Sequence, residues 1–193
     1  MRLLLSAFAP ELGSIASDPP LGWVTATVGV GAITAAAATA RLLAEQRPEA
    51  VVFLGTCGRY DTRLGLFDCL WAAAAIATSL AELRGDAYRP GIERIRWEAT
   101  LAGPLPTHPV AVPPAITRTL AGAQLLATVA PVEHLELTGV FAACHGAGVP
   151  CGGALVVVNE VGPEAPSQWL ANHAEGSRRL VAILRDSGFF AAP

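Results

Sequence analysis

The sequence predicts an α/β fold, with buried strands and helices alternating along a single domain that spans residues 1–193. Two observations predict this fold class. Short runs such as Ala154 to Val158 are continuously apolar, which is typical of strands buried on both faces of a sheet. Longer stretches lie between them and end at Pro or Gly, as Ala32 to Gln46 does before Pro48. This alternation is the pattern of a sheet covered by helices.

The elements follow from these patterns in chain order. The expected strands are Leu3 to Phe8, Trp23 to Val28, Ala50 to Leu54, Gln124 to Val129 and Ala154 to Val158. The expected helices are Ala32 to Gln46, Leu135 to Ala147 and Ser167 to Ser187. The pattern is least regular in the middle of the chain. There we expect a helix and a strand across the Ala-rich segment Trp71 to Ala81 and the charged stretch Arg84 to Glu98, then a short helix near Ala115 to Leu120.

Composition excludes several function classes. The mean hydropathy is +0.46, yet apolar runs such as Trp71 to Ala77 are too short to span a bilayer, so we expect no membrane partner. The net charge is −3 and the arginines are scattered, so we expect no nucleic-acid partner. All 13 basic residues are arginine, which excludes chemistry that needs a lysine, such as Schiff bases or a P-loop.

Cysteine and histidine usage points to no inorganic centre. The four cysteines form no CxxC pair, and the four histidines lack the spacing of metal ligands. We therefore expect reduced thiols, a cytoplasmic location, no metal and no cofactor.

Two glycine-containing segments are expected at the carboxyl ends of strands, where open α/β sheets bind ligands. Gly29-Val30-Gly31 leads into a helix, so its backbone amides can face an anion or a sugar hydroxyl. Gly55-Thr56-Cys57-Gly58 follows the next strand and is expected to form a turn. A dinucleotide fingerprint is not met, because Thr34 stands where the third glycine belongs. Taken alone, the first segment equally fits glycines that serve only a tight turn.

Three polar positions are candidates for chemistry. Glu11 comes three residues after the first expected strand, Glu136 opens a helix beside His134 and Leu135, and Asn159 ends a strand before Gly162. Each has an ordinary alternative: a solvated carboxylate, a carboxylate at a helix N-terminus, and a turn residue.

Together these segments resemble the nucleoside phosphorylase and nucleosidase superfamily. Val28 to Ala35 and Phe53 to Gly58 are similar to its two strands with Gly-rich turns, and Leu135-Glu136 is similar to its Met-Glu segment. Asn159-Glu160-Val161-Gly162-Pro163, with Trp169 ten residues after the Asn, is most similar to the futalosine hydrolases. Phosphorylases and methylthioadenosine-type nucleosidases usually have an Asp at that Asn.

The resemblance implies a three-layer α/β/α fold with a central mixed, largely parallel sheet. It also implies a hydrolase that cleaves the N-glycosidic bond of a purine nucleoside, as futalosine hydrolases do in menaquinone biosynthesis, and we expect a homo-oligomer. By resemblance, Glu11 activates water and Glu136 holds the ribose hydroxyls with His134 nearby. Asn159 donates a hydrogen bond to purine N7. The remaining residues expected to bind substrate are Gly29, Val30, Gly31, Thr56, Cys57, Gly58 and Leu135.

Three alternatives stay open at this point. A purine nucleoside phosphorylase would need a cationic phosphate cradle, for which Arg59 is the only obvious candidate. A methylthioadenosine or adenosylhomocysteine nucleosidase shares most of the motifs. A catalytically silent nucleoside-binding protein would keep the fold without turnover. The stretch Thr128 to Glu133 is shorter than in the family, and no base-stacking aromatic can be assigned from the sequence.

Overall fold

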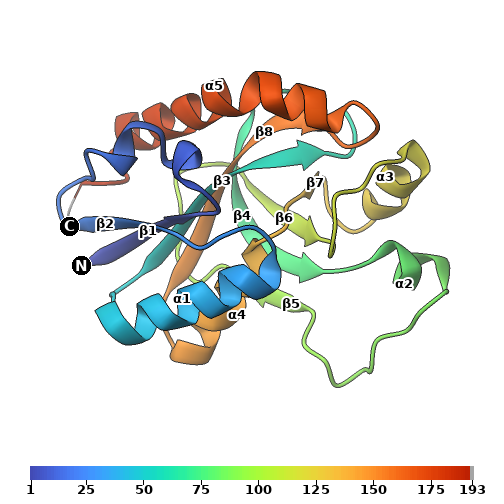
Figure 1. Ribbon diagram of the computed structural model, residues 1–193, viewed down its shortest axis with the longest axis horizontal. Helices are drawn as coiled ribbons and strands as arrows, with labels where there is room; N and C mark the ends of the chain where they lie inside the picture. Colours follow the sequence, from blue (N-terminus) through green and yellow to red (C-terminus); the bar gives the residue numbers. More distant parts are fainter. Residues whose placement is uncertain (192–193) are drawn as a thin grey trace.

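Eight strands form one sheet with helices on both faces within residues 1–191, the part of the chain that this computed structural model describes (Figure 1). The strands are β1 (Arg2–Ser6), β2 (Trp23–Thr27), β3 (Val51–Arg59), β4 (Cys69–Ala77), β5 (Arg96–Glu98), β6 (Thr107–Val112), β7 (Val132–Glu133) and β8 (Cys151–Glu160). The helices are α1 (Ala32–Gln46), α2 (Leu80–Arg84), α3 (Leu120–Leu126), α4 (Leu137–Ala147) and α5 (Ala165–Asp186), with a 3₁₀ helix, η1 (Ala9–Ala16), after β1. The predicted α/β class is confirmed.

The sheet mixes parallel and antiparallel neighbours. Its order is β2-β1-β3-β7-β6-β4-β5, and β8 pairs with both β3 and β4. The pairs β1–β2, β1–β3, β3–β8, β4–β6 and β6–β7 are parallel. The pairs β3–β7, β4–β5 and β4–β8 are antiparallel. Because antiparallel pairs reach the central strands, the sheet is mixed there and not only at its edge.

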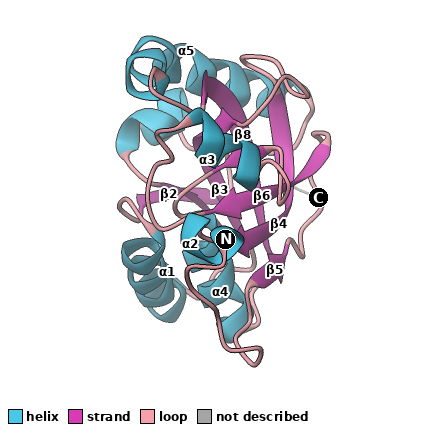
Figure 2. Cartoon of the chain, turned by 90° about the vertical axis from the view of Figure 1, so that its right-hand side faces the viewer, coloured by secondary structure: helices cyan, strands magenta, loops and turns pink. Residues whose placement is uncertain are grey.

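The core lies on both faces of β3 and β8. Val51 and Phe53 pack with residues of α1 and α4, whereas Val52 and Leu54 pack with residues of α5. Figure 2 shows α1 and α4 on one face of the sheet and α5 on the other. This follows from the alternation of side chains along a strand. Burial on both faces explains why these strands read as continuous apolar runs.

The second expected Gly turn is wrong: Gly55-Thr56-Cys57-Gly58 is the second half of β3, and it pairs with β8 up to Arg59. Glycine is required at Gly55 and Gly58 because a larger residue would clash with neighbouring side chains. A Cβ on Gly55 would lie 3.0 Å from Nε2 of His134, and one on Gly58 would lie 2.7 Å from Nδ2 of Asn159. Small residues therefore let pocket side chains lie directly on the strand.

Local propensity also misassigned the middle of the chain. The Ala-rich segment from Trp71 forms β4 rather than a helix, because β6 and β8 pair with it on both sides. Gln124 to Val129 is not a strand, since its first half belongs to α3. The short helix begins at Leu120 and not near Ala115, because the Oγ1 of Thr119 caps it by accepting a hydrogen bond from the Gly122 N–H at 3.1 Å. The long helices α1, α4 and α5 lie within two residues of their predicted bounds.

Helices α1 and α4 cross at very close range. A Cβ on Gly139 would lie 2.0 Å from the carbonyl oxygen of Ala32, so only glycine permits this approach. The crossing brings the first turn of α4 against the turn that precedes α1. It therefore places Glu136 beside Gly31, which matters for the pocket described next.

Candidate active site

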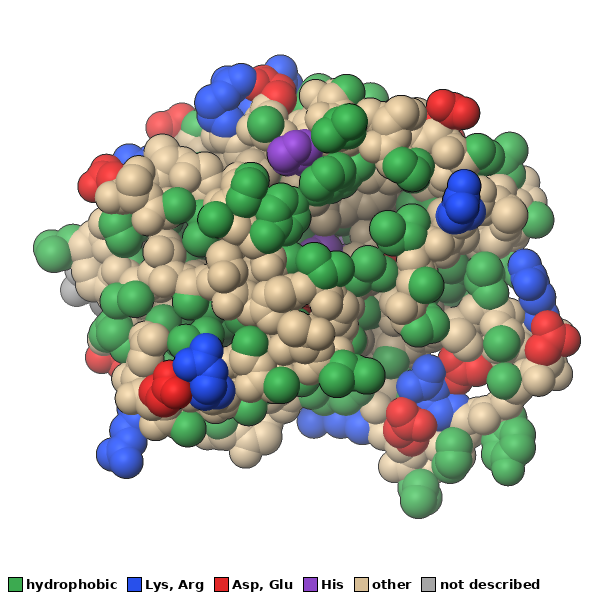
Figure 3. Space-filling model, in the orientation of Figure 1, with side chains coloured by type: hydrophobic (Ala, Val, Ile, Leu, Met, Phe, Trp, Pro, Cys, Tyr) green, Lys and Arg blue, Asp and Glu red, His purple; other side chains and the backbone are tan. Residues whose placement is uncertain are grey.

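A pocket of about 350 Å³ opens at the carboxyl ends of β1, β2, β3 and β8. Figure 3 shows its mouth as a hollow surrounded by hydrophobic side chains. The strand ends, the η1 turn, the segment between β7 and α4, and the start of α5 all contribute to its walls. The lining residues are Ala7, Phe8, Glu11, Val30, Thr56, Cys57, Gly58, Ile116, Glu133, His134, Leu135, Glu136, Asn159, Ala165, Pro166 and Trp169.

The structure thus brings together most of the residues singled out from the sequence. Glu11, Val30, Thr56, Cys57, Gly58, His134, Leu135, Glu136 and Asn159 all line the pocket. Gly29 and Gly31 do not line it, but they shape its edge as left-handed turn residues with φ of 81° and 90°. The roles of these residues in binding and catalysis remain predictions.

Glu11 is held by three hydrogen bonds and is almost completely buried. Its Oε1 accepts from the backbone N–H and from the hydroxyl of Thr56, both at 2.9 Å. Its Oε2 accepts only from the Ala7 N–H, at 3.2 Å. Oε2 therefore keeps an unused lone pair on a carboxylate that lines the pocket.

Burial raises the pKa of Glu11 to about 7, and repulsion from Glu136 adds to this rise. The hydrogen bonds from Thr56 and Ala7 oppose it because they favour the charged form. A carboxylate with a pKa near neutrality can take up a proton and release it again at physiological pH, as a general base must.

Glu136 lies at the N-terminus of α4 and is held by the first Gly turn. Its Oε1 accepts a hydrogen bond from the Gly31 N–H at 2.8 Å. The Gly31 amide therefore binds a protein carboxylate, whereas the sequence suggested that it would face a ligand. Unused lone pairs on Glu136 remain available for hydroxyl donors.

His134 is buried against Phe53, and burial lowers the pKa of its imidazole. The ring is therefore neutral at pH 7. Its Nδ1 accepts the Glu136 N–H at 3.1 Å, so the ring proton is on Nε2. Although Nδ1 also lies 3.3 Å from Oε2 of Glu136, this contact is not an ion pair, because the same nitrogen cannot carry a proton while it accepts one. His134 positions the backbone of Glu136.

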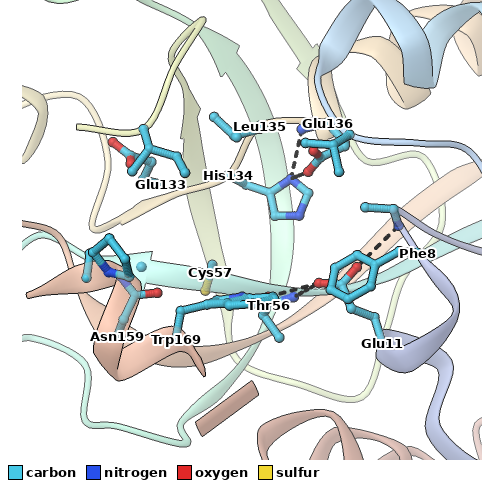
Figure 4. A pocket seen from close by; sticks show the side chains of 16 residues that line it. Phe8, Glu11, Thr56, Cys57, Glu133, His134, Leu135, Glu136, Asn159 and Trp169 are labelled. Carbon is cyan, nitrogen blue, oxygen red and sulfur yellow. Dashed lines mark hydrogen bonds and ion pairs between the residues drawn. The ribbon is translucent and has the colours of Figure 1, made fainter. Parts of the chain in front are cut away.

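The other end of the pocket has an amide and a carboxylate on either side of a glycine. Gly58 of β3 pairs with Asn159 of β8 on one side and with Glu133 of β7 on the other. Directly paired residues point to the same face of a sheet, and neighbouring strands lie about 4.8 Å apart. Figure 4 shows Asn159 and Glu133 at one end of the pocket and Glu11 and Glu136 at the other.

Glu133 is a pocket residue that the sequence patterns did not indicate. It accepts hydrogen bonds from the Tyr60 hydroxyl and the Thr117 N–H, each at 3.1 Å, and burial raises its pKa. Its strand has only two residues, too few for a periodic signal. Phe8 and Trp169 were also missed as lining residues. Trp169 stood out only as part of the futalosine hydrolase motif, and its place in the pocket depends on the docking of α5.

The described residues contain neither a cluster of metal ligands nor a helix able to cross a membrane. Across residues 1–191, no group of three or more His, Cys, Asp or Glu side chains is arranged to hold a metal ion. Over the same range, no helix combines the length and apolar character that crossing a membrane requires.

Comparison with known proteins identifies the fold. No protein-family model and no curated protein sequence matches the chain. Among solved structures, futalosine hydrolase from Helicobacter pylori matches with a TM-score of 0.81 at 17% identity, over 95% of each chain. 5'-Methylthioadenosine/S-adenosylhomocysteine nucleosidase from the same organism gives 0.81 at 16% identity, over 96% of each chain. The chain has the fold of these nucleosidases.

The resemblance inferred from the sequence motifs is thus confirmed for the fold. A third nucleosidase, from Colwellia psychrerythraea in complex with adenine, matches with a TM-score of 0.76 at 16% identity, over 93% of this chain and 92% of that one. The nucleosidase fold therefore extends over nearly the whole chain. At this level of identity the likeness concerns the fold, and the chemistry has to be argued from the pocket.

Proposed function

We propose that this protein hydrolyses the N-glycosidic bond of a purine nucleoside. The observation that carries the proposal is the separation of two kinds of group in one pocket. Carboxylates suited to a sugar and to water lie at one end, and the Asn159 amide lies at the other. N-glycoside cleavage needs this separation, because positive charge develops on the sugar while negative charge develops on the departing base.

Each group has a role in the proposed reaction. Oε2 of Glu11 takes a proton from water as the water oxygen bonds to the anomeric carbon, and the bond to the base nitrogen breaks with its electron pair going to the base. Glu136 accepts hydrogen bonds from the ribose hydroxyls. The amide of Asn159 donates to purine N7, and Glu133 accepts from a base N–H. Asn159 stabilises the leaving base without delivering a proton.

Hydrolysis is favoured over phosphorolysis by the charge of the pocket. Its lining contains three glutamates and no arginine. Arg59, the candidate for a phosphate cradle, is not among the lining residues. Its Nη1 donates to the Leu64 carbonyl at 2.8 Å, and its Nη2 lies 3.6 Å from Oε2 of Glu160. Phosphate would therefore enter a pocket of its own charge sign without a cation to bind it.

Base release is expected to be independent of phosphate. The purified protein should liberate free purine from a panel of nucleosides, including inosine, futalosine and methylthioadenosine, at equal rates with and without phosphate at about 50 mM, which exceeds a typical KM. Free base and free sugar are both measured by chromatography. A sugar 1-phosphate as product would replace hydrolysis by phosphorolysis. Ligand-induced thermal stabilisation without turnover would support the catalytically silent alternative.

The choice of nucleoside substrate rests on Asn159. An Asp that can carry a proton is usual in the methylthioadenosine nucleosidases, so Asn159 favours a futalosine-type substrate and a role in menaquinone biosynthesis. In the same proposal the protein acts in the cytoplasm on its small-molecule nucleoside substrate.

We also propose that the active form is a homo-oligomer whose second copy covers the pocket mouth. Val30 and Ile116 line the pocket yet are 61% and 58% exposed. Three further apolar side chains are more exposed still. Ile33 comes shortly after Val30 in the chain, Leu120 comes shortly after Ile116, and Leu170 directly follows Trp169. Exposed apolar side chains gathered around a cavity indicate a surface that another molecule covers.

The oligomer is tested at Ile33, which is 88% exposed on the first turn of α1 and is not a pocket residue. Light scattering should give a multiple of the 19.9 kDa chain mass for the natural protein and a smaller assembly for Ile33→Glu. Ile92→Glu is the matched control and should not change the mass, because this residue lies in the loop between α2 and β5, is 99% exposed and does not line the pocket. A monomeric natural protein would refute the proposal.

A further inference from the structure

Trp169 holds a fixed orientation beside the proposed general base. Its ring stacks on His173, one helical turn later on α5, with centroids 4.3 Å apart and planes 11° apart. Phe8 packs against it at 5.8 Å. These contacts aim the indole N–H at the Thr56 hydroxyl, 3.1 Å away. Figure 4 shows Trp169, Thr56 and Glu11 in a row along one wall of the pocket.

The direction of each hydrogen bond in this row is fixed by chemistry. An indole nitrogen can only donate, so the Thr56 oxygen must accept from Trp169. The single proton of that hydroxyl is then free for another acceptor, and Oε1 of Glu11 lies 2.9 Å away. The chain therefore runs from the Trp169 N–H through the Thr56 O–H to Glu11.

We propose that Trp169 is a positioning residue for Glu11: by orienting the Thr56 hydroxyl toward Oε1, it leaves Oε2 as the oxygen that exchanges a proton in the pocket. The proposal rests on the proposed function for its kinetic consequence but not for its structural one. Without the indole N–H, the Thr56 hydroxyl can rotate to other acceptors, and one of the two bonds to Oε1 weakens.

The environment of Glu11 makes this bond measurable. Burial and Glu136 raise its pKa, and the Thr56 hydroxyl lowers it, so weakening that bond raises the pKa further. The other titratable groups of this region are Cys57 on β3, Glu133 on β7, His134 and, on α5, His173. Burial raises the pKa of the Cys57 thiol, which keeps it neutral at the pH values that matter.

The structural part is tested without any turnover, by NMR of the 15N-labelled indole groups between about pH 5 and 9, which brackets a carboxyl pKa shifted by burial. The Trp169 N–H, assigned with Trp169→Phe, should titrate with a midpoint near 7, following Glu11 through Thr56. This titration should vanish in Glu11→Gln and in Thr56→Val. Trp71 is the internal control, because its Nε1 donates to the Leu101 carbonyl. A Trp169 signal that stays flat, or still titrates in Glu11→Gln, would overturn the proposal.

The kinetic part uses the pH profile of kcat/KM. Trp169→Phe keeps the aromatic ring and should move the acidic limb up by roughly 0.5 pH unit, because cooperative strengthening amounts to a fraction of one hydrogen bond. The activity loss is then about threefold on the acidic limb and small at high pH. Thr56→Val should shift the acidic limb at least as far, and combining it with Trp169→Phe should cause no further shift. Thr56→Ser keeps the hydroxyl, so its acidic limb should lie where that of the natural protein lies.

Trp97→Phe, on β5 and away from the pocket, is the matched control and should leave the profile unchanged. An equal loss at every pH, or additive effects of Trp169→Phe and Thr56→Val, would show that the indole acts only by packing. If the natural protein releases no base from any nucleoside, the proposed function fails, and the indole titration still decides the role of Trp169.

Discussion

Glu11→Gln is expected to lower kcat/KM by roughly 10²- to 10⁴-fold, the range typical of losing a general base. The amide oxygen can still accept the two shorter hydrogen bonds, from Thr56, and only the 3.2 Å bond from the Ala7 N–H is lost. The amide cannot take a proton from water, however. Steady-state kinetics of base release will measure the effect. Glu45→Gln is the matched control, because Glu45 is an exposed partner of Arg41 on α1. Unchanged kinetics in Glu11→Gln would show that another group activates the water.

The natural protein should gain activity as pH rises through about 7, because Glu11 must be ionised to accept a proton. Its stability should change in the opposite direction. The pKa of this carboxyl is raised from 4.5 to about 7 in the folded state, so below pH 4.5 it does not lower the free energy of unfolding. As pH rises toward the folded pKa, the carboxyl lowers the free energy of unfolding progressively. The loss reaches about 3 kcal/mol above that pKa, since each pKa unit corresponds to about 1.4 kcal/mol.

Glu11→Gln cannot ionise, so it should not lose this free energy of unfolding and should be more stable than the natural protein at pH 8. Urea unfolding at pH 5 and at pH 8 tests the sign. A natural protein that becomes more stable over this interval, relative to the Gln variant, would contradict the raised pKa. The inactive variant is thus expected to be more stable, as is common where a buried charge serves catalysis.

Asn159→Ala should lower kcat and kcat/KM together, by roughly 10²- to 10³-fold, which is the scale of removing one donor from a charge-stabilising site. The bond to purine N7 strengthens as negative charge builds on the base, so the loss falls on the transition state. Asn172→Ala is the matched control. The Asn172 amide donates to the Val158 carbonyl at 2.9 Å and does not line the pocket, so its loss should lower stability and spare catalysis.

Asn159→Asp tests whether the side chain must donate a hydrogen bond to purine N7 or need only be polar. A protonated Asp can donate to N7, whereas an ionised Asp repels the developing charge, so activity should survive mainly at lower pH. Because Glu11 must be ionised at the same time, the profile should narrow to a bell. Its low-pH limb is set by Glu11 and its high-pH limb by the new carboxyl, so the high-pH plateau of the natural protein is lost. Unchanged kinetics and unchanged fold in Asn159→Ala would show that the residue only forms the strand end.

The sequence alone located most of the pocket residues along the chain. Strand ends, helix starts and the Asn159 motif are local patterns, and residues at the carboxyl ends of neighbouring strands meet at one edge of a sheet. This is why Glu11, Glu136 and Asn159, which the family resemblance singled out, line one pocket. The same local patterns failed at Gly55 to Gly58 and in the Ala-rich β4, where pairing with distant strands overrode the propensity of the segment.

Only the tertiary structure decided which partners these residues have. Thr56 and Glu11 are 45 positions apart, and Trp169 is 113 positions from Thr56, so no sequence period links them. Glu133 reaches the pocket from a strand of two residues because Gly58 pairs with it. Burial, which raises the pKa of Glu11, is likewise a property of the packed molecule. The residue types were set by the sequence, and their hydrogen bonds and protonation were set by contacts between segments far apart in the chain.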